Sequence, residues 1–126
     1  MRLQPLLFCK AILNETKNMI NYDDFKKVEM KIGRVLSAER VEGSDKLLKL
    51  SVDFAEENPR QVVSGIGKYF EDLETLVGKQ YAFVTNLEPR SIMGLESQAM
   101  IIAASTETDI AFFDAQQTIP PGTSLK

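Results

Sequence analysis

Hydrophobic and polar residues alternate along several short stretches of this chain, which is the pattern of half-buried β-strands. In the stretch 47–54, LLKLSVDF, one face carries only apolar residues: Leu48, Leu50, Val52 and Phe54. An earlier stretch, from about Val28 to Val41, begins with the same alternation, which Gly33 interrupts. A glycine inside a strand indicates a bulge or a tight bend. The first half of the chain is therefore predicted to form a long, bent strand followed by a regular one.

Further strands and one short helical connection complete the pattern. The strands are predicted at 61–66 (QVVSGI), 80–86 (QYAFVTN) and 98–105 (QAMIIAAS), with one more short strand at 109–115 (DIAFFDA). Residues 67–78 carry apolar side chains at helical spacing and finish on Gly78, a residue that suits a helix end. The segments 42–46 and 55–60 are predicted to be turns.

This order of elements predicts an all-β fold. Five strands, a glycine kink in the first strand and a short helix between strands 3 and 4 match the five-stranded oligonucleotide- and oligosaccharide-binding (OB) barrel. Two packed sheets are the alternative from the pattern alone. We assign residues 19–126 to this domain and residues 1–18 to an N-terminal extension or linker, or to upstream translation if Met19 is the true start.

Composition narrows the class of protein. The length of 126 residues fits one domain, and 44% hydrophobic residues fits a globular chain. The net charge of −3 argues against indiscriminate coating of nucleic acid, although it leaves room for a local basic face. No apolar run approaches the ~20 residues that span a membrane. The lone Cys9 cannot form an intrachain disulfide, so we expect a cytoplasmic protein.

The absence of histidine limits the chemistry further. It excludes Ser-His-Asp and Cys-His catalysis and argues against a zinc site. Carboxylate or lysine chemistry remains possible in principle. Since no acid–base pair or activated nucleophile is visible, we expect no catalytic residues, no metal and no cofactor.

The two loops that flank the predicted groove carry candidate phosphate contacts. In an OB barrel the groove lies across strands 2 and 3, between loops 1–2 and 4–5. Loop 1–2 supplies Lys46 and loop 4–5 supplies Arg90. Both cations can neutralise phosphates; the alternative is that they are ordinary solvated surface charges.

Polar residues also stand where the strand 98–105 should begin. Asn86, Ser97 and Gln98 can hydrogen-bond bases or sugars, and Met100 can pack on a base, as suits unstacked RNA. Ser97 and Met100 would face opposite sides of a regular strand, so we expect Ser97 in the loop and Met100 partly exposed at the strand's start. The alternatives are that Asn86 caps its own loop and that Met93 and Met100 belong to the core.

Several motifs, in order along the chain, resemble a known family. They are SDKLLKLSVDF, RQVVSGIGKYF, LVGKQ, NLEPRSIMGLESQAM and PPG. Together they resemble the tRNA-binding domain that is appended to many methionyl-tRNA synthetases and that also occurs as a free-standing protein. The resemblance covers about Tyr22 to Lys126.

The resemblance implies an OB barrel that binds tRNA by shape, without catalysis, metal or cofactor. It implies that the chain assists a methionyl-tRNA synthetase catalytic chain and forms a homodimer. The tRNA contacts that it implies are Lys46, Asn86, Arg90, Ser97 and Met100.

This chain departs from the family at three positions, of which one is Ala99, where the family often has glycine, and the other two are in the loop before it. Ser91 stands where the family usually has a basic residue, and Glu88 where it often has lysine or alanine. These departures keep a chaperone-like or protein-interaction barrel as the alternative.

The predicted short strand 109–115 offers a surface for the homodimer. It contributes Ile110, Phe112 and Phe113 beyond the barrel's five strands. The alternative is that Phe112 and Phe113 cover one end of the barrel.

Overall fold

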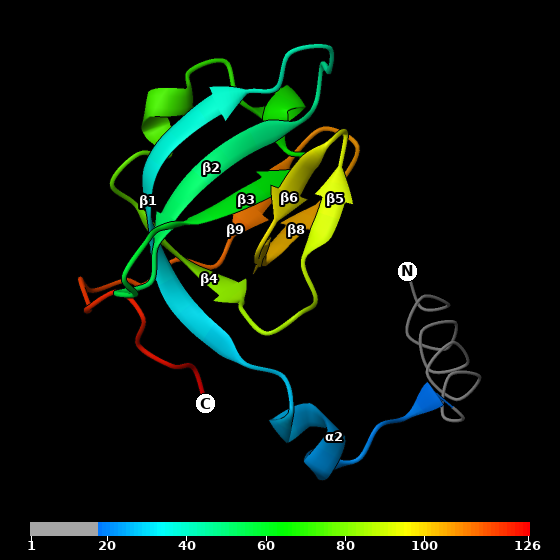
Figure 1. Cartoon of the computed structure of the whole chain (residues 1–126), viewed down its shortest axis with the longest axis vertical. Helices are drawn as coiled ribbons and strands as arrows, with labels where there is room; N and C mark the ends of the chain where they lie inside the picture. Colours follow the sequence, from blue (N-terminus) through cyan, green and yellow to red (C-terminus); the bar gives the residue numbers. More distant parts are fainter. Residues whose placement is uncertain (1–17) are drawn as a thin grey trace, which may run out of the picture.

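A computed structural model describes residues 18–126, so the extension proposed for residues 1–18 lies almost wholly outside the described part. One antiparallel sheet, in the order β3-β2-β1-β4-β7, curls into a nearly closed barrel (Figure 1). Its strands are β1 (Met30–Arg40), β2 (Leu48–Asp53), β3 (Arg60–Ser64), β4 (Gln80–Val84) and β7 (Met100–Ile101). The predicted all-β, five-stranded barrel is thereby confirmed.

The core forms on the face of β2 that the alternation predicts. Leu48, Leu50 and Val52 are almost completely buried, and Phe54 packs edge-on against Phe83 with ring centroids 5.2 Å apart. A β-carbon on Gly33 would lie 2.6 Å from side-chain atoms of both Phe54 and Val52, so only glycine fits at this crossing of β1.

The irregularity of β1 lies beyond the predicted one at Gly33. The register between β1 and β2 shifts between Val35 and Ser37, which marks a bulge there. Gly33 itself keeps its pairing with Tyr81 of β4. The glycine therefore serves close packing, and the bulge bends the strand.

The connection between β3 and β4 is two 3-10 turns, η2 (Gly67–Tyr69) and η3 (Leu73–Thr75), where the sequence predicts a short helix. Phe70 is extended between the turns, with its ring stacked on Phe112 at 5.8 Å. The Asp72 carboxylate then starts η3 by accepting a hydrogen bond from the backbone N–H two residues later. The predicted helix is thus divided at Phe70, whose ring packs on Phe112.

The predicted strand 98–105 is also divided. After β7 the chain leaves β4, and β8 (Ala103–Ser105) pairs instead with β9 (Ile110–Phe112). Phe112 packs inward, 4.9 Å from the Tyr81 ring, whereas Phe113 is 54% exposed. Phe112 therefore covers the barrel, and Phe113 faces solvent.

A short helix, α2 (Tyr22–Lys26), precedes β1 and lies clear of the barrel (Figure 1). Asn21 caps it, because its side-chain oxygen accepts a hydrogen bond from the Asp24 N–H at 2.8 Å. None of the residues of α2 is buried. Within residues 18–126, no helix is long and apolar enough to cross a membrane.

Candidate nucleic-acid interface

The segment between β4 and β7 forms a hairpin that the sequence analysis missed. Its strands are β5 (Arg90–Ile92) and β6 (Leu95–Ser97). The two residues between them, Met93 and Gly94, both have positive φ, as a type I′ hairpin turn requires. The Asn-Gly pair that usually marks this turn is replaced by Met93-Gly94, so the sequence predicted only a loop. The structure shows that this prediction was wrong.

The hairpin closes the barrel through side chains. The Ser97 hydroxyl accepts a hydrogen bond from the Val63 N–H at 3.0 Å and donates to the Ala99 carbonyl at 3.1 Å. The Gln98 side-chain oxygen accepts from the Gln61 N–H at 2.9 Å, and the Gln98 N–H donates to the Gln61 carbonyl at 2.8 Å. Serine and glutamine side chains therefore satisfy the free edge of β3, where a backbone ladder would otherwise be needed.

Arg60 also helps to close the barrel between β3 and the segment before β7. One guanidinium nitrogen donates to the carbonyls of Thr85 at 2.6 Å and Gln98 at 3.1 Å. The other two nitrogens bind the Glu56 carboxylate at 2.8 and 2.7 Å. These charge-assisted hydrogen bonds from Arg60 hold the pKa of Glu56 below its usual value. Arg60 is therefore committed to joining β3, β4 and the segment before β7.

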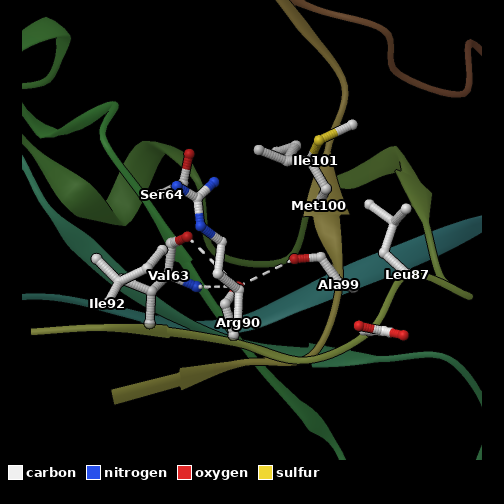
Figure 2. A pocket seen from close by; sticks show the side chains of 10 residues that line it. Val63, Ser64, Leu87, Arg90, Ile92, Ala99, Met100 and Ile101 are labelled. Atoms are coloured by element: carbon white, nitrogen blue, oxygen red, sulfur yellow. Dashed lines mark hydrogen bonds between the residues drawn. The ribbon is translucent and has the colours of Figure 1, made fainter. Parts of the chain in front are cut away.

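A pocket of about 140 Å³ opens where the hairpin, β7 and the end of β3 meet. Figure 2 shows Leu87 and Met100 on one side and Arg90 on the other, with the Arg90 side chain pointing toward Ser64. Leu87 and Met100 are 52% and 50% exposed. The remaining lining residues are Val63, Glu88, Ile92, Ser97, Ala99 and Ile101.

The structure brings three of the five predicted site residues to this pocket. Arg90 and Met100 present exposed side chains, whereas Ser97 is buried and its hydroxyl is already bonded within the barrel. Ser97 belongs to β6, so the expectation that it lies in a loop was wrong.

The other two predicted residues lie outside the pocket. Asn86 accepts a hydrogen bond from the Glu29 N–H at 2.8 Å and donates to the Lys27 carbonyl at 2.6 Å. It therefore fixes the junction of α2 and β1 and does not cap its own loop. Lys46 is exposed in the loop before β2, and its carbonyl accepts from the Gly67 N–H at 2.7 Å.

Two lining residues were not selected for the site from the sequence, although their side chains can contact a ligand. They are the exposed Leu87 and the charged Glu88. The sequence noted Glu88 only as a departure from a family pattern. No group of three metal-binding side chains is found among residues 18–126. The pocket's polar groups are thus a guanidinium, a carboxylate and hydroxyls beside an apolar wall.

Residues 30–124, which include every residue of this pocket, match the family described as a putative tRNA binding domain. The chain belongs to this tRNA-binding domain family. The methionine–tRNA ligase of Caldanaerobacter subterraneus subsp. tengcongensis is 42% identical over 116 residues, which is 92% of this chain and 18% of that protein. The domain thus spans less than a fifth of the curated relative it matches.

Two solved structures have a similar fold over most of this chain. A MetRS-related protein from Pyrococcus horikoshii superimposes with a TM-score of 0.77 at 37% identity, covering 86% of this chain and 98% of that one. The chaperone CsaA of Bacillus anthracis gives a TM-score of 0.75 at 28% identity, over 86% and 99% of the two chains. The fold is therefore similar both to a MetRS-related protein and to a chaperone.

Proposed function

We propose that this chain binds tRNA in the cytoplasm as a non-catalytic module, through shape and backbone contacts at the end of the barrel that carries the hairpin. Membership of the tRNA-binding domain family is the observation that supports it most directly. The proposed contacts are the exposed side chains of Arg90, Lys46 and Met100. Asn86 and Ser97 would act by holding the backbone beside them, because their polar atoms are bonded within the protein.

Phosphate neutralisation by a few cations would supply most of the affinity. Among residues 18–126, four cations are paired with carboxylates, and Arg90 and Lys46 are not among them. Each phosphate neutralised on a duplex contributes a slope of about −0.9 to the dependence of log affinity on log salt concentration. We therefore expect a modest affinity that falls steeply with salt.

A titration with total tRNA at two salt concentrations tests this proposal. Arg90→Ala and Lys46→Ala should each weaken binding and each reduce the salt slope by about one charge. Thermal stability should stay the same, because exposed charges contribute little to it. Lys79→Ala is the matched control, since this exposed lysine lies at the opposite end of β4 from the hairpin. No binding of tRNA at low salt, or full affinity in both variants, would overturn the proposal.

We further propose that the domain adds tRNA affinity to a methionyl-tRNA synthetase catalytic chain, either fused to it or in trans. The match to one region of a methionine–tRNA ligase supports this. Addition of the domain to a synthetase that lacks such a region should lower its KM for tRNA and leave its KM for methionine unchanged. An unchanged KM for tRNA would contradict it.

We also propose a homodimer. The exposed large apolar residues are concentrated before β1: Met19, Ile20, Tyr22, Phe25 and Val28. Such a patch on a small protein favours association with a partner surface. Phe113, which the sequence predicted for the interface, is also exposed. Phe112, predicted for the same interface, packs against Tyr81 of the barrel. Light scattering should give a dimer mass that Phe25→Glu converts to a monomer; a monomer of the unaltered chain at micromolar concentration would exclude the dimer.

A chaperone-like barrel is the second candidate, and the likeness to CsaA favours it. The acidic Glu88 at the pocket also points away from phosphate binding. If this candidate is correct, the chain should suppress aggregation of an unfolded protein at concentrations where it does not bind tRNA.

A further inference from the structure

We propose that the pocket between the hairpin and β7 receives one unstacked nucleobase of the RNA and that Glu88 selects bases carrying an exocyclic amino group. This inference rests on the proposed tRNA binding and names the chemical group that enters the site. It assigns a role to Glu88, one of the residues at which this chain departs from the family pattern.

The size of the pocket limits its occupant. A cavity of about 150 Å³ is enough to hold a benzene ring. The volume of about 140 Å³ therefore fits a single planar ring system. The sugar and phosphate of the same nucleotide would remain outside, within reach of the surrounding solvent and surface cations.

The walls of the pocket suit the faces of an aromatic ring. Leu87 and Met100 leave about half of their surfaces exposed on one side, and Ile92 lines it as well. A flexible thioether makes favourable contacts with aromatic rings. Exposure of large apolar side chains around a ring-sized hollow is costly in water, and an inserted base would cover them.

The charged groups are the second observation: with Glu88 present they disfavour a phosphate inside the pocket, whereas the exposed Arg90 can still neutralise a phosphate outside it. Among residues 18–126, Arg90 and Glu88 are the charged residues that line the pocket. Within residues 18–126, neither side chain forms an ion pair or a hydrogen bond, with the other or with a third residue. The Glu88 carboxylate at the edge of the pocket would repel a phosphate that entered it. Together the two groups offer a donor and an acceptor to the edge of a base.

The acceptor determines which bases fit. An ionised carboxylate only accepts hydrogen bonds, and it pairs well with the amino group of cytosine. Uracil has a carbonyl oxygen at the same ring position, which would face the carboxylate with lone pairs on both sides. Arg90 can donate to the O2 carbonyl that both pyrimidines share. Cytosine and uracil are therefore ligands of the same size that differ at the exocyclic group Glu88 is proposed to contact and at the adjacent ring nitrogen N3, which accepts in cytosine and donates in uracil.

The experiment measures binding of the whole chain to short uridine-rich single strands. One internal position carries cytosine, uracil or an abasic site, and total tRNA is titrated in parallel. We expect cytosine to be preferred over uracil by about fivefold or more, the effect of one good base-edge contact. The abasic strand should bind more weakly than either.

Two variants separate the apolar contact from the polar one. Met100→Ala should weaken binding of cytosine and uracil strands alike by about twofold to tenfold, the range for a thioether against an aromatic ring. Glu88→Gln should abolish the preference for cytosine, because the side-chain amide can rotate and donate to the uracil carbonyl. Ser91→Ala is the control, since Ser91 is exposed on the hairpin but does not line the pocket.

The outcomes distinguish this inference from the proposed function. If tRNA binds but the cytosine, uracil and abasic strands bind equally, the base pocket is wrong and tRNA binding stands. A preference for cytosine that persists in Glu88→Gln would remove Glu88 from base selection. If neither tRNA nor any strand binds at low salt, the proposed function itself fails.

Discussion

Replacing Ser97 by alanine should destabilise the barrel more than it weakens RNA binding. Ser97 is 8% exposed, and its hydroxyl accepts from the Val63 N–H and donates to the Ala99 carbonyl. Alanine would leave a buried N–H without a partner, which costs about 1–3 kcal/mol in the free energy of unfolding. For a domain of this size that corresponds to a fall in Tm of about 4 °C for each kcal/mol.

Chemical denaturation beside a tRNA titration, both well below Tm, measures the two effects separately. Ser91→Ala supplies the control within the same hairpin, because Ser91 is exposed and should change stability by less than about 0.5 kcal/mol. The tRNA affinity of Ser97→Ala should remain within about twofold of the unaltered chain, once the unfolded fraction is taken into account. A loss of affinity with an unchanged free energy of unfolding would refute this reasoning, because Ser97 would then have to contact RNA directly.

Two further substitutions test other parts of the structure. Gly33→Ala should cost about 1–3 kcal/mol, because its methyl group would overlap the core, whereas Gly65→Ala meets no atom within 4 Å and should be tolerated; equal stability of the two variants in urea would show that the core can yield at β1. Glu56 has a pKa below its unfolded value, so its contribution is present at neutral pH and is lost as pH falls through the folded pKa. Glu56→Gln should therefore be less stable at pH 7 and lose less stability on acidification below about pH 4.5, and parallel acid denaturation curves would contradict this.

Most of the barrel was predictable because its strands bury one face. The alternation of Leu48, Leu50 and Val52 fixes which side of β2 enters the core, and it does so without knowledge of the neighbours. The 3-10 turns after β3 were not predictable in the same way. Their division depends on where the Phe70 ring meets Phe112, a contact between segments 42 residues apart in the sequence.

The hairpin was missed for a different physical reason. Its turn places Met93 at a φ of 49°, a conformation that methionine rarely adopts and that no propensity would assign to it. The hairpin strands are only three residues long, too short for a periodic pattern. Arg90 and Met100 were nevertheless selected correctly as exposed groups. That Glu88 lines the same pocket followed only from the three-dimensional arrangement.

The segment from Ser97 to Ile101 shows why Ser97 and Met100 play different parts at the pocket although both line it. Ser97, Ala99 and Ile101 are buried, whereas Gln98 and Met100 are more exposed, so the period of two continues although β6 ends and β7 begins within it. The buried residues Ser97, Ala99 and Ile101 line the same pocket as the exposed Met100. The Ser97 hydroxyl is bonded within the barrel, whereas the Met100 thioether is exposed, so we expect the two residues to act on different properties. The double variant should therefore combine the lower stability of Ser97→Ala with the tRNA affinity of Met100→Ala, to within about twofold; a further loss of affinity in the double variant would show that Ser97 contacts the RNA.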